Sequence, residues 1–202
     1  PAMLVLHGSG GSPRFLPAMQ KLSDRFEVFI PQAPGFGGTP LPPWLETIAD
    51  VANFYLEFLE MFDLRDVHLV GLSLGGMGAL LLARRYAADV AGIVLLAPFL
   101  GTPGVVAEVV RAGGLAAWQP GVIAPNDGER KMLAWLKDHV AAAPRPPVLH
   151  LGYGRDDRFA AGHAMLAETL PAERVHVTEG GHDWQAWSRL WRRILATEPF
   201  AP

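Results

Sequence analysis

Short apolar segments alternate with helical segments along this chain, and that alternation limits the folds open to it more than any other feature. Six segments have the length and apolar character of buried strands: residues 3–6, 27–30, 67–70, 93–96, 148–151 and 175–178. Helical patterns lie between and after them, over residues 15–22, 47–62, 74–86, 160–170 and 184–195. The alternation predicts an α/β fold with a doubly wound, mostly parallel sheet of about six strands and helices on both faces.

One long region interrupts the alternation. Residues 98–147 contain no strand pattern and are rich in Pro, Gly and Ala, with helical patterns over residues 105–112 and 129–140. A long insertion of this kind in an α/β unit is more often a lid or a binding element than a simple connection. We therefore expect a single domain over residues 1–202 with an insertion at about 98–147.

The composition argues against several classes of function. A net charge near −3 provides no basic surface for nucleic acid or for an anionic membrane. The chain has no cysteine, which excludes a disulfide framework, a thiol nucleophile and a thiolate metal site. No apolar run reaches the roughly 18 residues of a membrane span, and no leader precedes the first strand, so a cytoplasmic location is expected. The sequence predicts neither a metal site nor a cofactor.

Ser73 lies between two glycines, Gly71 and Gly75, where a strand pattern passes into a helical pattern. A tight strand-to-helix turn holds such a serine in a strained backbone with its hydroxyl pushed out of the sheet. Only residues without a bulky side chain fit two positions before and two after it. The pattern predicts a nucleophile elbow; the alternative is a glycine-rich turn that merely packs the helix on the sheet.

A serine nucleophile needs a base within hydrogen-bond reach, and that base is oriented by a third group. Catalytic groups of a doubly wound sheet gather at the carboxyl ends of its strands. His182 lies in a glycine-flanked loop after a strand pattern and before a helix, so we expect it to be the base. The other histidines fall in or directly after strand patterns (His7, His68, His150 and His176) or in helical patterns where we expect them to be solvated (His139 and His163).

Two adjacent aspartates, Asp156 and Asp157, follow another strand pattern and compete for the role of the orienting acid. The spacing from Gly154 favours Asp157, with the other aspartate capping the next helix, but the reverse assignment stays open. We expect Asp183, next to the base, to be a helix-start residue that interacts well with the helix dipole.

The glycine-rich segment over residues 7–11 follows the first strand pattern and can present backbone N–H groups to a developing anion. The N–H of Leu74, directly after the serine, offers a second donor at a helix N-terminus. A phosphate-binding role for the segment is the alternative. It is weaker, because the Gly-Lys-Ser/Thr ending of a P-loop is missing, as is the G-x-G-x-x-G spacing.

These residues occur in the chain order Ser, Asp, His, and in this the sequence resembles the α/β-hydrolase superfamily. The segment 7–11 is similar to the oxyanion loop of that family. Residues 33–39 resemble its loop after the next strand, with Ala33 in place of the usual acidic residue. The resemblance implies a small cap over residues 98–147 and the following roles: Ser73 as nucleophile, Asp157 as acid, His182 as base, and Ser9 and Leu74 as oxyanion donors through their backbone N–H groups.

The leading expectation is a serine hydrolase that cleaves esters of small to medium acyl groups through an acyl-enzyme. Ester, thioester, amide and carbon–carbon bond hydrolysis all use this apparatus, and the fold does not choose among them. Acyl transfer to an acceptor besides water also fits, as does a binding protein without turnover. Aromatic residues that could line an apolar substrate site, each also explained by plain packing, are Phe36, Trp118, Trp135 and Trp184.

Members of the family usually begin with a hairpin of two strands, whereas here the first strand pattern starts near residue 2. We therefore expect either a compact hydrolase without the hairpin or a truncated sequence, with residues 27–30 forming an exposed sheet edge. An exposed edge presents unpaired backbone groups to other chains. The sequence thus predicts some tendency to form a homo-oligomer through this edge.

Overall fold

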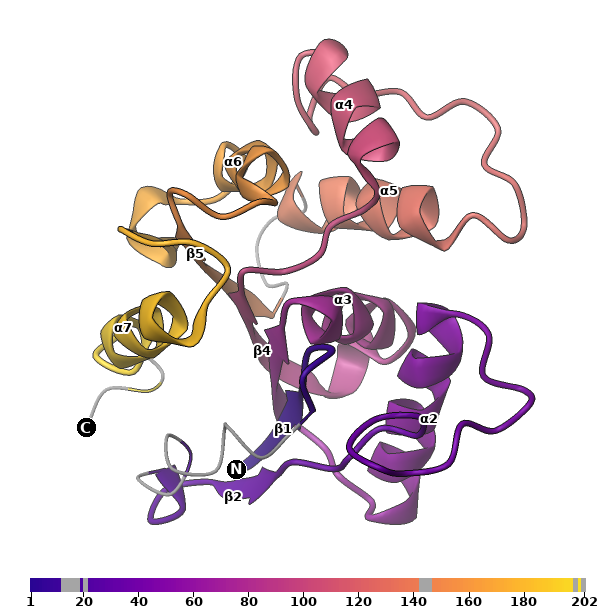
Figure 1. Cartoon of the computed structure of the whole chain (residues 1–202), viewed down its shortest axis with the longest axis vertical. Helices are drawn as coiled ribbons and strands as arrows, with labels where there is room; N and C mark the ends of the chain where they lie inside the picture. Colours follow the sequence, from indigo (N-terminus) through magenta and orange to yellow (C-terminus); the bar gives the residue numbers. More distant parts are fainter. Residues whose placement is uncertain (12–18, 20–21, 142–146, 198–199, 201–202) are drawn as a thin grey trace.

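The computed structural model describes residues 1–11, 19, 22–141, 147–197 and 200, and within them it contains a six-stranded parallel sheet flanked by helices (Figure 1). The strands are β1 (Ala2–Leu6), β2 (Glu27–Phe29), β3 (Val67–Leu72), β4 (Val90–Leu96), β5 (Val148–Gly154) and β6 (Val175–Thr178). The helices are α2 (Ile48–Met61), α3 (Leu74–Arg85), α4 (Pro103–Arg111), α5 (Gly128–Ala141), α6 (Ala160–Ala167) and α7 (Trp184–Ile194). The fold class and the six strands predicted from the sequence are confirmed, while the helix expected over residues 15–22 lies largely outside the described residues.

The strands are ordered β2-β1-β3-β4-β5-β6, and every neighbouring pair is parallel. The register aligns the carboxyl ends of the central strands: Leu72 pairs with Leu96, and Leu96 pairs with Gly152. Gly154 at the end of β5 pairs in turn with Thr178 at the end of β6. The loops that follow these strands therefore begin along one edge of the sheet, where side chains from distant parts of the chain can meet.

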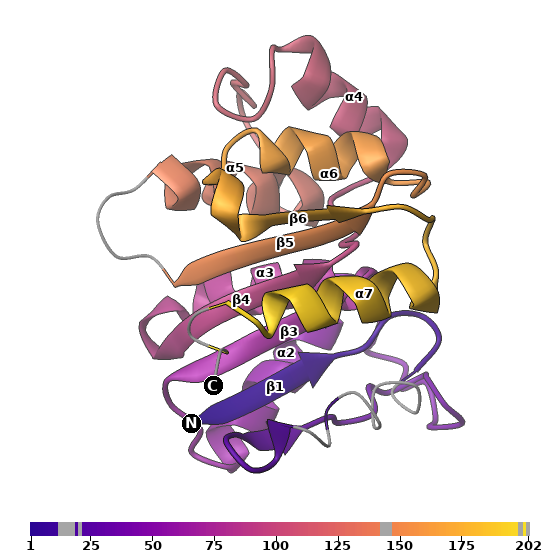
Figure 2. The same cartoon turned by 90° about the vertical axis from the view of Figure 1, so that its left-hand side faces the viewer.

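Helices cover both faces of the sheet because alternate side chains of each strand point to opposite sides. On β1, Met3 and Val5 belong to a core cluster that includes Ile194 of α7. Leu4 and Leu6 belong to the other cluster, with the buried side chains of α2 and α3. Figure 2 shows this layering, with α7 in front of the strands and α2 and α3 behind them. Among the described residues, no helix is both long enough and apolar enough to cross a membrane.

The two helices predicted within the insertion are present as α4 and α5. They pack on different neighbours: α5 contacts α3, whereas α4 contacts α6 (Figure 1). The buried side chains Met132, Leu133 and Leu136 attach α5 to the main core, and Val105 and Val109 do the same for α4. The insertion thus extends the helical layer on one face of the sheet.

The sheet ends in two short edge strands, and β2, with three residues, is one of them. It pairs with β1 through Glu27, Val28 and Phe29, which agrees with the edge expected for residues 27–30. The other edge strand is β6, where the guanidinium group of Arg193 donates a hydrogen bond to the backbone oxygen of Val177. That bond occupies one of the acceptors that the β6 edge would otherwise present to another chain.

Candidate active site

Ser73 occupies the sharp turn between β3 and α3, at the N-terminus of the helix. Its backbone has a φ of 51° and a ψ of −117°, a conformation that L-residues with a side chain rarely adopt. Backbone hydrogen bonds fix the turn: the N–H of Ser73 donates to Leu96 O at 3.0 Å, and its carbonyl accepts from Phe99 N at 2.8 Å. Strain of this kind persists only where the surroundings impose it, and it concentrates at functional sites.

The glycines around Ser73 are required because a Cβ at their positions would overlap neighbouring atoms. A Cβ on Gly71 would lie 2.6 Å from the backbone oxygen of Gly75, and a Cβ on Gly75 would overlap the backbone of Leu6. A Cβ on Gly76 would lie 2.6 Å from Pro98 Cβ. The start of α3 therefore approaches the ends of β1 and β4 more closely than any side chain would permit.

Three side chains from different strand ends meet at this turn. The Nε2 atom of His182 lies 2.8 Å from Ser73 Oγ, and its Nδ1 atom lies 2.8 Å from Asp157 Oδ2. A carboxylate only accepts hydrogen bonds, so Nδ1 carries the proton and donates to Asp157. The free lone pair is then on Nε2 and can accept the hydroxyl proton of Ser73. Such a chain of contacts is the arrangement in which an imidazole activates a serine.

The environment of Asp157 keeps its carboxylate ionised and in place. Its side chain is fully buried, and burial alone would raise its pKa. The hydrogen bonds from His182 and from the backbone N–H of Phe159 outweigh burial, so the pKa of Asp157 is lowered below its ordinary value. The neighbouring Asp156 is exposed and accepts instead from Gly180 N at 3.3 Å. Of the two aspartates left open by the sequence, the one in contact with His182 is Asp157.

The loop that carries His182 is tied down at both ends. Asp183 caps α7 by accepting from the backbone N–H groups of Gln185 and Ala186, and its second oxygen accepts from Gly181 N. These bonds, that to Ala186 first, hold the pKa of Asp183 below its usual value. The expected helix-start role of Asp183 agrees with this geometry, which also fixes the residue before His182.

His7 anchors the glycine-rich loop opposite the helix α3. Its Nε2 accepts from the backbone N–H of Ala33 at 3.0 Å, so its Nδ1 carries the proton and donates to Gly8 O at 2.8 Å. Burial lowers the pKa of His7 and favours this neutral form. Gly8 is held against the serine, since a Cβ on it would lie 3.2 Å from Ser73 Cβ.

The two expected oxyanion donors flank this contact. Ser9 follows Gly8 in an exposed turn, and Leu74 is the first residue of α3. Within the described part of the chain, neither backbone N–H has a hydrogen-bond partner. The structure therefore leaves both groups available to a ligand.

The sequence interpretation placed His139 and His163 wrongly. His139 is half-buried, with its ring stacked on Trp135, and burial lowers its pKa. The larger departure concerns His163. It was expected to be solvated in its helix, yet its side chain is fully buried. Its Nε2 donates to the backbone oxygen of Pro98 at 2.9 Å, and burial lowers its pKa. Because Phe99, next along the chain, donates to Ser73 O, this bond links α6 to the turn that holds the serine. No sequence signal pointed to it, because its partner lies 65 residues away.

The four aromatic candidates for a substrate site are dispersed. Phe36 contacts the ring of His7 at 5.3 Å and lines a small cavity beside Leu74. Trp118 is buried, with its Nε1 donating to a glutamate of α4, and Trp135 stacks on His139. Trp184 packs against Trp187, whose ring contacts His182. Packing alone accounts for Trp118 and Trp135. Phe36 lies beside Leu74, the residue after the serine, and Trp184 is linked to the histidine through Trp187.

Side chains that could ligate a metal ion are dispersed as well. In residues 1–11, 19, 22–141, 147–197 and 200, no group of three or more His, Cys, Asp or Glu side chains is arranged to hold a metal ion. The side-chain groups that do converge at the turn after β3 are the hydroxyl of Ser73, the imidazole of His182 and the carboxylate of Asp157.

The amino-acid sequence matches a family model and several curated proteins. The model of a family described as alpha/beta hydrolase fold matches residues 1–146. A pimeloyl-[acyl-carrier protein] methyl ester esterase of Aromatoleum aromaticum is 39% identical over 98 residues, which are 48% of this chain and 36% of that protein. An uncharacterized protein of Mycobacterium tuberculosis is 33% identical over 97 residues, 48% of this chain and 28% of that protein. The match thus spans only about a third of these curated relatives.

Solved structures match over nearly the whole chain. A meta-cleavage product hydrolase from Pseudomonas fluorescens superposes with a TM-score of 0.68 at 20% identity, covering 96% of this chain and 89% of that one. A thermophilic esterase from Thermogutta terrifontis gives a TM-score of 0.66 at 20% identity, covering 96% and 87%. At this level of identity the likeness concerns the fold.

Proposed function

The chain belongs to the alpha/beta hydrolase fold family, and on that premise we propose that it is a serine hydrolase that cleaves carboxylic ester bonds of small to medium acyl substrates. Ser73 Oγ attacks the ester carbonyl while His182 Nε2 takes its proton. The tetrahedral intermediate collapses to an acyl-enzyme as the same nitrogen gives the proton to the departing alcohol. Water then attacks the acyl-enzyme with His182 again as base, which releases the acid and restores Ser73.

One observation carries the proposal: the imidazole of His182 contacts both Ser73 Oγ and Asp157 Oδ2, each at 2.8 Å. In this role Asp157 holds the imidazole in the tautomer that leaves Nε2 free, and it stabilises the imidazolium that forms. The backbone N–H groups of Ser9 and Leu74 are the proposed donors to the oxyanion. One such donor is worth about 10²–10³ in rate.

The ester bond is the proposed target for two reasons. Two of the similar proteins described above are named as esterases, one by sequence and one by structure. A largely apolar pocket near His182 also suits an uncharged substrate. Hydrolysis of a carbon–carbon bond is the second candidate, favoured by the likeness to a meta-cleavage product hydrolase. Acyl transfer and thioester hydrolysis would use the same three side chains, and a binding protein would keep the fold without turnover.

A fluorophosphonate probe tests the proposal, because it reacts with an activated serine whatever the natural substrate. We expect the native protein to be labelled and Ser73→Ala to be unlabelled. Ser188→Ala is the matched control, since Ser188 lies within α7 and bonds to its own helix; its labelling should equal that of the native protein. An unlabelled native protein would overturn the proposed chemistry, and labelling without cleavage of p-nitrophenyl esters would overturn the choice of bond.

A further inference from the structure

A pocket of about 270 Å³ lies between α4 and α6. One of its lining residues, Phe159, contacts the proposed base His182. Its walls are mostly apolar and include Leu100, Pro103, Val106, Val110, Phe159 and Ala161. Among its described lining residues, Arg158 is the single one with a charge. None of the four aromatic residues proposed from the sequence contributes to it.

The α4 wall presents apolar side chains that the described part of the chain covers only in part. Val106 and Val110 lie one turn apart on the helix, and the side chain of Val110 is 51% exposed. Their neighbours Val105 and Val109 point into the core instead. The helix thus buries Val105 and Val109 in the core and places Val106 and Val110 at the pocket.

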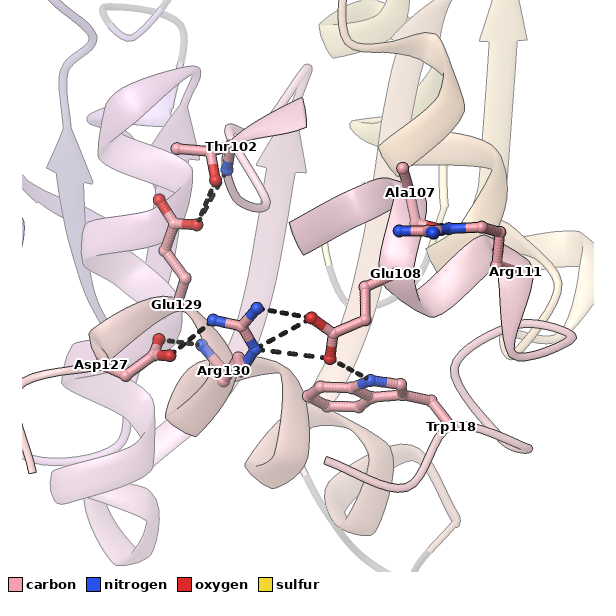
Figure 3. A network of polar contacts seen from close by, with 8 residues as sticks. All are labelled: Thr102, Ala107, Glu108, Arg111, Trp118, Asp127, Glu129 and Arg130. Atoms are coloured by element: carbon pink, nitrogen blue, oxygen red, sulfur yellow. Dashed lines mark hydrogen bonds and ion pairs between the residues drawn. The ribbon is translucent and has the colours of Figure 1, made fainter. Parts of the chain in front are cut away.

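Polar contacts on the far side of α4 fix this wall in place (Figure 3). Glu108 accepts from Trp118 Nε1 at 2.9 Å and from Arg130 Nε at 3.1 Å. The guanidinium of Arg130 also donates to Asp127 at 2.7 Å. The hydrogen bonds from Arg130, and then from Trp118, lower the pKa of Glu108, so it is ionised at neutral pH. The network attaches α4 to the start of α5 and makes the pocket a preformed feature.

Phe159 connects the pocket to the proposed active site. Its ring lines the pocket and also contacts the ring of His182 edge to face, with 5.1 Å between centroids. Its backbone N–H donates to Asp157 Oδ1 at 2.9 Å, and its ring packs on Phe99 at 5.4 Å. Phe159 therefore contacts both the pocket and the proposed base.

We propose that this pocket binds the acyl chain of the ester, as an unbranched alkyl chain, and that Phe159 sets the length of chain that the site accepts. The inference rests on the proposed esterase function and names its substrate class. Each buried methylene contributes a transfer free energy that corresponds to about a fourfold gain in binding. The specificity constant kcat/KM should therefore rise about fourfold per methylene until the pocket is filled.

The test compares p-nitrophenyl acetate, butyrate, hexanoate and octanoate. We expect kcat/KM to rise along this series for the native protein. In Val106→Trp the indole fills the pocket, so the octanoate-to-acetate ratio should fall at least tenfold. Val122→Trp is the matched control, because Val122 is fully exposed in the loop between α4 and α5, and its ratio should equal that of the native protein. Val110→Trp, at a more exposed position, provides a second blocking variant should the first one not fold.

Phe159→Ala tests the second half of the proposal. Removal of the ring should move the preferred chain toward decanoate, whatever the loss of absolute rate. An unchanged octanoate-to-acetate ratio in both tryptophan variants, with esters still cleaved, would overturn the pocket assignment while leaving the proposed function intact. If no ester is cleaved and no fluorophosphonate label is taken up, the proposed function fails and the acyl-chain assignment fails with it.

Discussion

At the scale of single residues, the proposed nucleophile Ser73 lies in a strained backbone conformation. Its φ of 51° places it in a region that glycine adopts freely and serine does not. The strain costs about 1–3 kcal/mol of folding free energy. Glycine would therefore be more stable at this position, whereas the proposed reaction needs the serine hydroxyl.

This conflict leads to a prediction about stability. Ser73→Gly should unfold at a higher temperature than Ser73→Ala, by an amount equivalent to about 1 kcal/mol, because only glycine relieves the strain. Thermal unfolding followed by circular dichroism measures the difference. At Ser188, inside α7, the order should be reversed, since glycine is the poorer helix former. The same order at both positions would contradict the strain at Ser73.

The adjacent aspartates lead to a prediction about activity. Asp157→Asn should lower kcat by about 10⁴, because the amide cannot hold His182 in the tautomer that leaves Nε2 free. Asp156→Asn should lower it far less, since that carboxylate accepts a hydrogen bond from the backbone N–H of Gly180 and not from His182. Steady-state kinetics on one ester distinguishes the two variants. A greater loss in Asp156→Asn would exchange their proposed roles.

At the scale of elements, the close contact between α3 and β1 depends on glycine at one position more than at its neighbours. A methyl group on Gly75 would overlap the backbone of Leu6, which cannot move without disturbing the sheet. We expect Gly75→Ala to cost about 3 kcal/mol or more, which lowers Tm by about 6–12 °C in a chain of this size.

Gly78, one turn further along α3, provides the matched control for that measurement. A Cβ there would meet only Leu6 Cδ2, at 3.3 Å, and this methyl group ends a flexible side chain. Alanine is also the better helix former. Gly78→Ala should therefore leave Tm unchanged or raise it, and equal losses in the two variants would count against the close approach at Gly75.

The elements themselves could largely be predicted from the sequence, because strands buried on both faces produce short apolar runs and the helices between them have their own pattern. The strand-to-helix turn at Ser73 and the loop of His182 could be recognised because each follows a strand pattern and precedes a helical pattern. His163 was not, since an isolated polar residue in a helix suggests solvent, and its partner Pro98 is remote in sequence. The pocket could not be foreseen either, because its walls come from α4 and α6, which are joined only by folding.

At the scale of the whole molecule, several buried histidines make stability depend on pH. Burial lowers the pKa of His7, His68, His163 and His176 below the ordinary value. As pH falls through about 6.5, the unfolded chain therefore takes up protons that the folded chain does not. The stability present above this pH is then lost progressively toward the lower pKa values of the folded state.

Urea unfolding at pH 7.5, 6.5 and 5.5 measures this dependence. We expect the free energy of unfolding to decrease at each step toward acid. Between pH 7.5 and 8.5 it should change little, because these four imidazoles are neutral in both states. A protein equally stable at pH 5.5 and 7.5 would show that the buried histidines accept protons without loss of the fold.

The position of β2 at the edge of the described sheet leads to a prediction about association. Strand pairing through Glu27, Val28 and Phe29 would join two sheets, so light scattering should reveal a dimer whose population grows with concentration. Val28→Pro removes a backbone donor from the edge and should shift the equilibrium toward monomer. A strict monomer at high concentration would contradict this expectation.

The contact between Ser73 and His182 joins residues 109 positions apart, and Asp157 reaches the same place from a third strand end. These contacts need β3, β5 and β6 in place, so a sheet that lacks β5 or β6 does not possess them. If Ser73 is the nucleophile as proposed, reactivity toward a fluorophosphonate reports that β5 and β6 are in place. Molecules that retain most of their helices but have lost β6 would then not be labelled by the probe.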